Sequence, residues 1–86
     1  MNRNEIMNEL RNVIVENLEL EAPEILRETD KLYDDLNIDS IMMLQLIVYI
    51  EEVFQVSIPE EEIDLNVFST AGSLADFIES LQKATV

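Results

Sequence analysis

The chain has 86 residues, 48% of them hydrophobic, which is enough for one small domain with one modest core. Nineteen acidic and five basic residues give a net charge of −14, which argues against binding to nucleic acid or to anionic membranes. Cysteine and histidine are absent, so disulfides, thiolate metal sites and the usual general base are excluded. Without a long apolar run or a signal-like start, the protein is expected to be cytoplasmic.

The basic residues are unevenly distributed along the chain. Between Leu32 and Gln82 there is no Lys or Arg, while eleven acids fall in that stretch. The simplest interpretation is a surface kept soluble by charge, and the functional one is a surface that meets basic patches on partner proteins. Both interpretations stay open at the level of composition.

The first amphipathic segment covers residues 4–18, where apolar side chains recur at helical spacing and predict a helix. Arg3 and Arg11 are expected to form at most weak ion pairs with neighbouring acids. The periodicity breaks over residues 19–39, which predicts a long loop pinned to the core by apolar side chains. A loop of that length in a compact domain is usually functional. Its apolar anchors are Ile25, Leu26, Leu32, Tyr33 and Leu36.

Asp39 is predicted to be the N-cap of a second helix over residues 40–55. One side of this helix carries an apolar stripe spanning about 120° of arc, as a core-facing helix should. Met42 and Tyr49 lie between this stripe and the opposite face, and we expect the preceding loop to cover them. The stripe contains Met43, Leu46, Ile47, Ile50, Val53 and Phe54.

The opposite face of the second helix is also partly apolar, because it holds Ile41, Leu44 and Val48. Folding does not require a second apolar stripe, so these three side chains need another explanation. We predict a docking surface whose apolar centre gives affinity and whose polar and acidic rim gives orientation. The rim consists of Gln45, Glu51 and Glu52.

The remaining chain predicts two further helical segments. Pro59 precedes three glutamates at 60–62, a favourable first turn for a brief helix. A last amphipathic helix is predicted to begin near Gly72 and Ser73. The expected fold is therefore all-α, a small bundle of three main helices and one short helix forming a single domain over residues 1–86, with its core at about 5–82.

Two kinds of site were weighed and rejected. Asp35, Asn37 and Asp39 alternate as calcium ligands do, but an EF-hand loop needs Gly and Glu where Ser40 and Leu46 stand. Loose binding of divalent cations to this acidic surface stays open. A hydrolase is no better supported, because Ser40 has no histidine base and no G-x-S-x-G elbow. We do not expect an enzyme.

Ser40 itself is, by residue type, a serine in the first turn of a helix. Exposed N–H groups at a helix start favour a phosphate ester. Asp35 and Asp39 would repel a free phosphate. This objection does not apply to a phosphodiester that another enzyme attaches covalently. Residue types alone leave the ordinary and the functional interpretation of Ser40 both open.

An ordered set of short motifs follows from Asp39 to the last helix. They are Asp39-Ser40-Ile41, Gln45-Leu46, Ile50-Glu51-Glu52-Val53-Phe54, Ile58-Pro59, Phe68-Ser69-Thr70 and Leu74-Ala75-Asp76-Phe77-Ile78. With these motifs the chain resembles the acyl and peptidyl carrier protein family over about residues 5–82. Two departures from the family pattern are Asn37, where glycine is frequent, and Gln45, where glutamate is frequent. Asn37 should only alter the turn, since asparagine tolerates left-handed backbone.

The resemblance implies that a phosphopantetheinyl transferase attaches 4'-phosphopantetheine from coenzyme A to Ser40, and that Asp39 caps the helix and helps the transferase recognise the site. The thiol of the arm would then hold a cargo as a thioester, while Ile41, Leu44, Val48 and the polar rim around them meet partner enzymes. It implies a carrier without catalytic residues of its own.

Residues 42–51 are more narrowly similar to the aryl carrier proteins of petrobactin-type siderophore assembly. This likeness implies a dihydroxybenzoyl cargo, loaded by an adenylate-forming ligase and passed to an amine by an acceptor synthetase or condensing enzyme. The alternatives are an acyl carrier protein of fatty-acid or polyketide synthesis, and an unmodified acidic interaction module.

Overall fold

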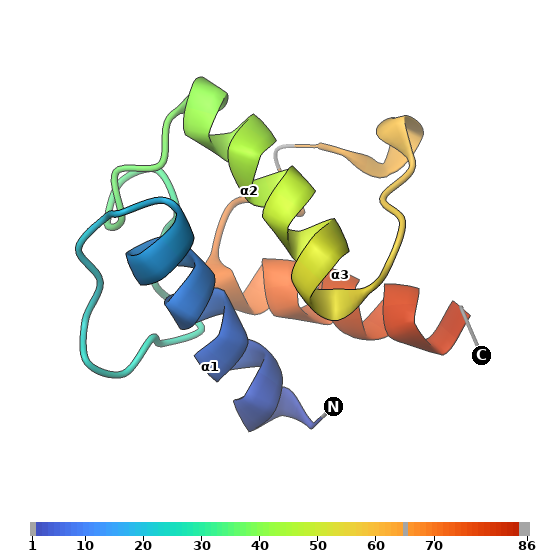
Figure 1. Ribbon diagram of the computed structural model, residues 1–86, viewed down its shortest axis with the longest axis horizontal. Coiled ribbons are helices and arrows are strands. Elements are labelled where there is room, and N and C mark those ends of the chain that lie inside the picture. Colours follow the sequence, from blue (N-terminus) through green and yellow to red (C-terminus); the bar gives the residue numbers. More distant parts are fainter. Residues whose placement is uncertain (1, 65, 85–86) are drawn as a thin grey trace.

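The computed structural model describes residues 2–64 and 66–84, so residues 1, 65, 85 and 86 of the predicted domain lie outside the described residues. Three α-helices dominate: α1 (Arg3–Asn12), α2 (Ser40–Phe54) and α3 (Ala71–Ala84). A π-helical turn, η1 (Val13–Asn17), extends α1, and a 3-10 turn, η2 (Glu60–Glu62), lies between α2 and α3. α1 packs against α3 and η1 against α2 (Figure 1). The predicted all-helical fold of three main helices and one short one is confirmed.

The start of α1 is fixed by a reciprocal cap. The N–H of Glu5 donates to Asn2 Oδ1 at 2.9 Å, and the N–H of Asn2 donates to Glu5 Oε1 at 3.3 Å, so two groups that a helix end leaves unpaired are satisfied together. The helix widens into η1 and ends at Asn17, close to the predicted end. Ile6, Leu10 and Ile14 lie on its buried face.

α2 begins where the sequence predicts. Asp39 has extended backbone and accepts the N–H of Met42 on its carboxylate at 2.9 Å, while its carbonyl accepts the N–H of Met43 at 2.8 Å. At the other end, Gln55 takes a left-handed conformation with φ of 55°, which terminates the helix. Met42 and Tyr49 are half-buried against the core.

The long loop over residues 18–39 is joined to the start of α3 by three backbone hydrogen bonds. The N–H of Gly72 donates to Glu28 O at 3.0 Å, the N–H of Ala71 to Asp30 O at 2.9 Å, and the N–H of Leu32 to Ser69 O at 3.1 Å. An alanine Cβ at position 72 would lie 2.9 Å from both Cβ and O of Glu28, so this glycine allows the loop to approach the helix closely.

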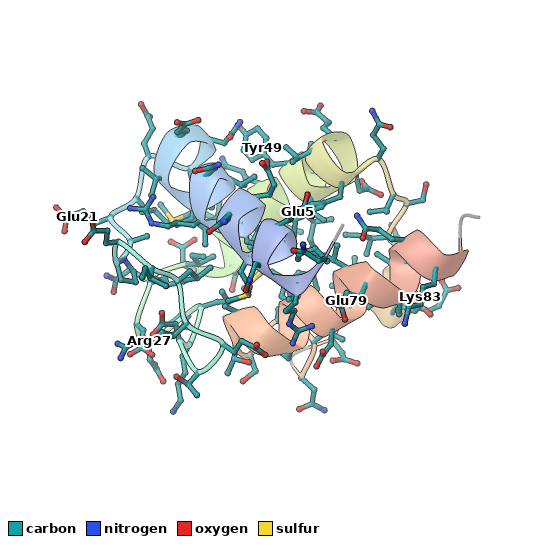
Figure 2. The ribbon with its side chains drawn as sticks, turned by 90° about the horizontal axis from the view of Figure 1, so that it is seen from below. Glu5, Glu21, Arg27, Tyr49, Glu79 and Lys83 are labelled. Carbon is teal, nitrogen blue, oxygen red and sulfur yellow. The ribbon has the colours of Figure 1, made fainter. Side chains whose placement is uncertain are left out.

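α3 begins at Ala71, one residue before the predicted start. Thr70 and Ser73 form a reciprocal cap there, because the N–H of each residue donates to the other's hydroxyl at 3.1 Å. Inside the bundle, buried side chains from all three helices and both connecting segments form one core. Charged side chains such as Glu21, Arg27 and Lys83 project away from the bundle (Figure 2).

Arg3 connects three parts of the fold. Its Nη2 lies 2.7 Å from Glu28 Oε1 on the loop, and its Nη1 lies 2.7 Å from Asp76 Oδ1 and 3.1 Å from Glu79 Oε2 on α3. The hydrogen bond to Glu28, reinforced by Asp76, raises the pKa of the guanidinium above its ordinary value. The expectation of a local ion pair for Arg3 is wrong, because the bundle brings distant acids beside the helix start.

Candidate functional site

Ser40 is the first residue of α2, and its side chain is exposed. Two features of the preceding loop hold it there. Ile38 is fully buried and its N–H donates to Leu32 O at 2.9 Å, so the chain is anchored two residues before the serine. Asn37 has φ of 59°, the left-handed geometry that was expected to be tolerable for asparagine at this turn. The anchored loop end therefore presents Ser40 at the surface.

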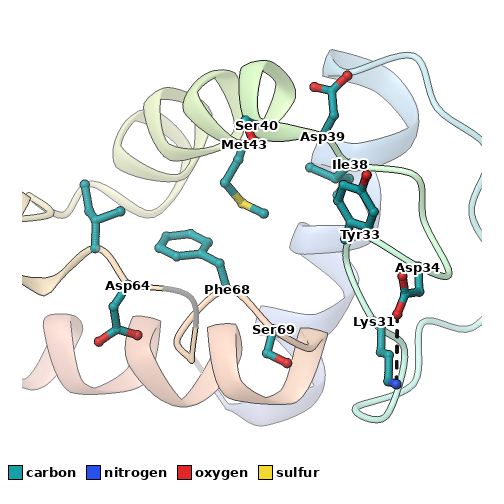
Figure 3. Close-up of a pocket in the computed structure, with 11 residues that line it drawn as sticks. Lys31, Tyr33, Asp34, Ile38, Asp39, Ser40, Met43, Asp64, Phe68 and Ser69 are labelled. Carbon is teal, nitrogen blue, oxygen red and sulfur yellow. Dashed lines mark ion pairs between the residues drawn. The ribbon is translucent and has the colours of Figure 1, made fainter.

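A pocket of about 520 Å³ opens beside Ser40 (Figure 3). Ser40 and Met43 of α2 line one side, and Phe68 and Ser69, before α3, line another. The ring of Phe68 is held edge-on by Phe77, with ring centroids 6.4 Å apart. The remaining lining residues are Lys31, Tyr33, Asp34, Ile38, Asp39, Ile63 and Asp64.

The apolar docking face predicted on α2 is exposed in the structure. Ile41, Leu44 and Val48 have 71%, 65% and 52% of their surface accessible, unusually high values for large apolar side chains grouped on one helix. The structure thus leaves the trio uncovered, as the sequence prediction requires.

The polar rim of this face is not uniform. Gln45 and Glu52 are exposed, whereas Glu51 is half-buried and its carboxylate accepts the N–H of Ile58 at 2.8 Å. Glu51 therefore fastens the segment after α2 to the helix, a structural contact that the helical wheel does not show. Glu52 is the more accessible acid of the pair.

The electrostatics around Ser40 are dominated by acids. Asp34, Asp39 and Asp64 line the pocket, and Lys31 is its single basic residue. Lys31 Nζ lies 4.0 Å from Asp34 Oδ2, so its charge is already partly balanced. In the described part of the chain, no group of three or more acidic, histidine or cysteine side chains is placed to hold a metal ion.

None of the helices in the described residues is long and apolar enough to cross a membrane. Sequence reasoning did not find the pocket beside Ser40. Its walls come from three separate segments, which local patterns do not bring together. The prediction that Ile25 and Tyr33 anchor the loop to the core is wrong, because they are 77% and 68% exposed, and Tyr33 lines the pocket instead.

A small helical bundle that presents a serine at a helix start, beside an uncovered apolar helix face, has the form of a carrier domain. The family model described as a phosphopantetheine attachment site matches residues 8–78, which include Ser40. The chain belongs to this family and is a non-catalytic, phosphopantetheine-dependent carrier protein. The family match also implies a phosphopantetheinyl transferase as partner.

Individual relatives agree with this assignment. The chain is 48% identical over 82 residues to the acyl carrier protein AsbD of Bacillus anthracis, covering 95% of this chain and 90% of the relative. It is 35% identical over 79 residues to an acyl carrier protein of Borreliella burgdorferi, covering 92% and 95%. The chain thus spans nearly the full length of both relatives.

Solved structures show the same fold. A holo acyl carrier protein from Nitrosomonas europaea, determined by solution NMR, superposes with a TM-score of 0.62 at 26% identity, covering 98% of this chain and 93% of that one. A chain from the crystal structure of a Bradyrhizobium japonicum glycine–carrier protein ligase complexed with glycylated carrier protein gives a TM-score of 0.64 at 24% identity, covering 88% and 96%.

Proposed function

We propose that Ser40 is the residue that carries the phosphopantetheine arm, and that the cargo is a dihydroxybenzoyl group used in the assembly of a petrobactin-like siderophore. The observation that carries the first part is the exposed hydroxyl of Ser40 at the capped start of α2, within the matched attachment-site region. The likeness of the chain to AsbD supports the second part.

The site suits a modification made by another enzyme. Attachment forms a bond between Ser40 Oγ and the phosphorus of the arm and breaks the diphosphate bond of coenzyme A, releasing its nucleotide half. The hydroxyl proton needs a base, and this chain contains no histidine to accept it. Asp39 is engaged in capping α2 through Met42, so it orients the serine. The transferase must supply the deprotonation.

Once attached, the arm supplies a thiol that holds the cargo as a thioester. The chain's own residues contribute position: Ile38 anchors the loop, Asp39 fixes the helix start, and Ser40 projects into solvent. Partner enzymes then need a common surface next to the arm. Ile41, Leu44 and Val48, with Gln45, Glu51 and Glu52 around them, are proposed to be that surface.

The experiment for Ser40 is intact mass spectrometry after incubation with coenzyme A and a phosphopantetheinyl transferase. One phosphopantetheine should be added to the wild type and none to Ser40→Ala. Ser69→Ala is a matched control, since Ser69 is exposed and lines the same pocket. Addition to Ser40→Ala, or none to the wild type with several transferases, would instead favour another site or an unmodified interaction module.

The docking face is tested by the kinetics of the transferase and of the loading ligase. Leu44→Ala should raise KM about tenfold with little change in kcat, because truncating a central apolar side chain of an interface costs about 1–2 kcal/mol. Ile25→Ala is the matched control, since Ile25 is 77% exposed but lies on the loop. Equal KM values for the two variants would contradict the assignment of the face.

The cargo is tested by loading the phosphopantetheinylated protein with an aryl-activating, adenylate-forming ligase. Dihydroxybenzoate should be transferred in preference to fatty acids, and the loaded protein should deliver it to an amine when an acceptor synthetase or condensing enzyme is added. Preferential loading with malonyl or long-chain acyl groups would show instead a carrier of fatty-acid or polyketide synthesis.

A further inference from the structure

The solvent-facing side of α2 is uncharged over most of its length. Residues 40–50 contain no acidic or basic side chain, although 28% of the chain is charged. A helix face in contact with water normally carries charged residues. The exposed side chains that follow the serine here form what we call the neutral strip, which leaves three large apolar groups in water. The neutral strip consists of Ile41, Leu44, Gln45 and Val48.

Along α2, charges border the neutral strip at its two ends. Asp39 is exposed before the strip and Glu52 is exposed after it. The carboxylate of Glu51 accepts the N–H of Ile58 at 2.8 Å and is thereby directed to the following segment. At a rise of about 1.5 Å per residue, about 20 Å separate Asp39 from Glu52. A partner protein thus meets an acid at each end of α2 and apolar surface between them.

Two occupants of the neutral strip are disfavoured. The loop before α2 is held at the start of α3 by backbone hydrogen bonds, such as that from the N–H of Ala71 to Asp30 O at 2.9 Å (Figure 1). A second copy of the chain carries the same net charge of −14 and repels the first. Pairing two strips about a twofold axis would also place acids beside acids, whether Asp39 meets Asp39 or Glu52. The occupant is therefore a different protein.

We propose that the enzyme that loads the arm receives the neutral strip in an uncharged apolar groove, and that Gln45 determines specificity by excluding enzymes with a basic surface there. The inference rests on the proposed function, because it takes this face of α2 as the docking surface. Ile41, Leu44 and Val48 stand at positions i, i+3 and i+7, the spacing of the anchors of a helix seated in a groove. The strip begins next to Ser40, so an enzyme seated on it is close to the base of the arm.

Desolvation is the physical basis of this specificity. A lysine or arginine of a partner would lose its water against Leu44 and Val48, and the amide of Gln45 has no charge to compensate for that loss. An apolar groove has no such loss and gains from removing three exposed apolar side chains from water. The amide of Gln45 can still donate to and accept from neutral polar groups at the edge of the groove. The neutral strip therefore selects an apolar partner surface, and charge acts only at its two ends.

The test is the KM of an aryl-activating, adenylate-forming ligase for the phosphopantetheinylated protein. Gln45→Glu and Gln45→Lys should both raise this KM, the former about tenfold, because a charge of either sign is desolvated in an apolar groove. Gln45→Leu should not raise it. Gln55→Glu is the matched control, since it adds the same charge at an exposed position beyond Glu52, and its KM should equal that of the wild type. Circular dichroism of Gln45→Glu should match the wild type, because Gln45 is exposed and both residues favour helix.

The alternatives predict different results. A basic partner surface would lower the KM for Gln45→Glu and raise it for Gln45→Lys, with both effects fading in high salt, and this outcome would overturn the proposal. A wild-type dimer in analytical ultracentrifugation that Gln45→Glu dissociates would assign the strip to a second copy and overturn it as well. Unchanged KM values for the Gln45 variants, with a raised KM for Leu44→Ala, would overturn this inference alone. An unchanged KM for Leu44→Ala would instead remove the docking face on which the inference rests.

Discussion

Replacing Arg3 with alanine should destabilise the protein more than the same replacement of any other basic residue on the surface. The guanidinium contacts the carboxylates of Glu28, Asp76 and Glu79, and its Nη2 also donates to Gly72 O at 3.2 Å. Exposed ion pairs contribute about 0.2–1 kcal/mol each, and the three together with the backbone contact give about 1–2 kcal/mol. For a domain of this size that lowers the Tm by about 4–16 °C.

Thermal unfolding followed by circular dichroism measures this effect, and Lys83→Ala is the matched control. Lys83 is exposed at the last turn of α3, and its loss changes the net charge by the same amount. We expect it to cost less than about 0.5 kcal/mol. Equal Tm values for Arg3→Ala and Lys83→Ala would refute the reasoning, because the effect would then come from net charge alone.

The pH dependence of this difference follows from the raised pKa of Arg3. A cation whose pKa is raised by folding stabilises the native state fully below its unfolded pKa, and the stabilisation is lost only as the pH rises through the folded value. Both values for an arginine lie far above neutrality. From about pH 7 to about pH 10 the guanidinium therefore stays charged, and its contribution to the Tm difference between the wild type and Arg3→Ala should stay constant.

Four further outcomes are expected. Asp39→Ala should cost about 1 kcal/mol in urea unfolding through loss of the α2 cap, and Asp39→Asn much less. Gly72→Ala should cost about 1–3 kcal/mol, because its Cβ would meet the backbone of Glu28, and unchanged stability would contradict that packing. Asn37→Gly should be tolerated while Asn37→Ala loses about 1 kcal/mol, as judged by the urea midpoint, since φ is positive there. Added salt should raise the Tm by screening self-repulsion in a chain of net charge −14, and a flat or falling Tm would argue against it.

Local sequence features predicted those parts of the protein that short-range interactions control. The cap at Asp39 and the helix that follows it depend on backbone groups within four residues, so the sequence was sufficient to place Ser40 at the start of α2. The exposure of Ile41, Leu44 and Val48 followed from helical periodicity, since one helix can turn only one face to a core.

Local sequence patterns could not predict the contacts between distant segments. The position of Arg3 beside Glu28, Asp76 and Glu79 depends on how α1 packs on α3, which no spacing in the sequence encodes. The structural role of Glu51 toward Ile58 likewise appears only when the chain turns after α2.

Ser40 illustrates the division most clearly. The sequence by itself determined that a serine opens a capped helix next to an uncovered apolar face, because caps and periodicity are local. Only the tertiary structure decided that this serine also borders a pocket, because Tyr33, Met43 and Phe68 come from three segments. Hydrogen bonds between the loop and the start of α3 bring those segments together.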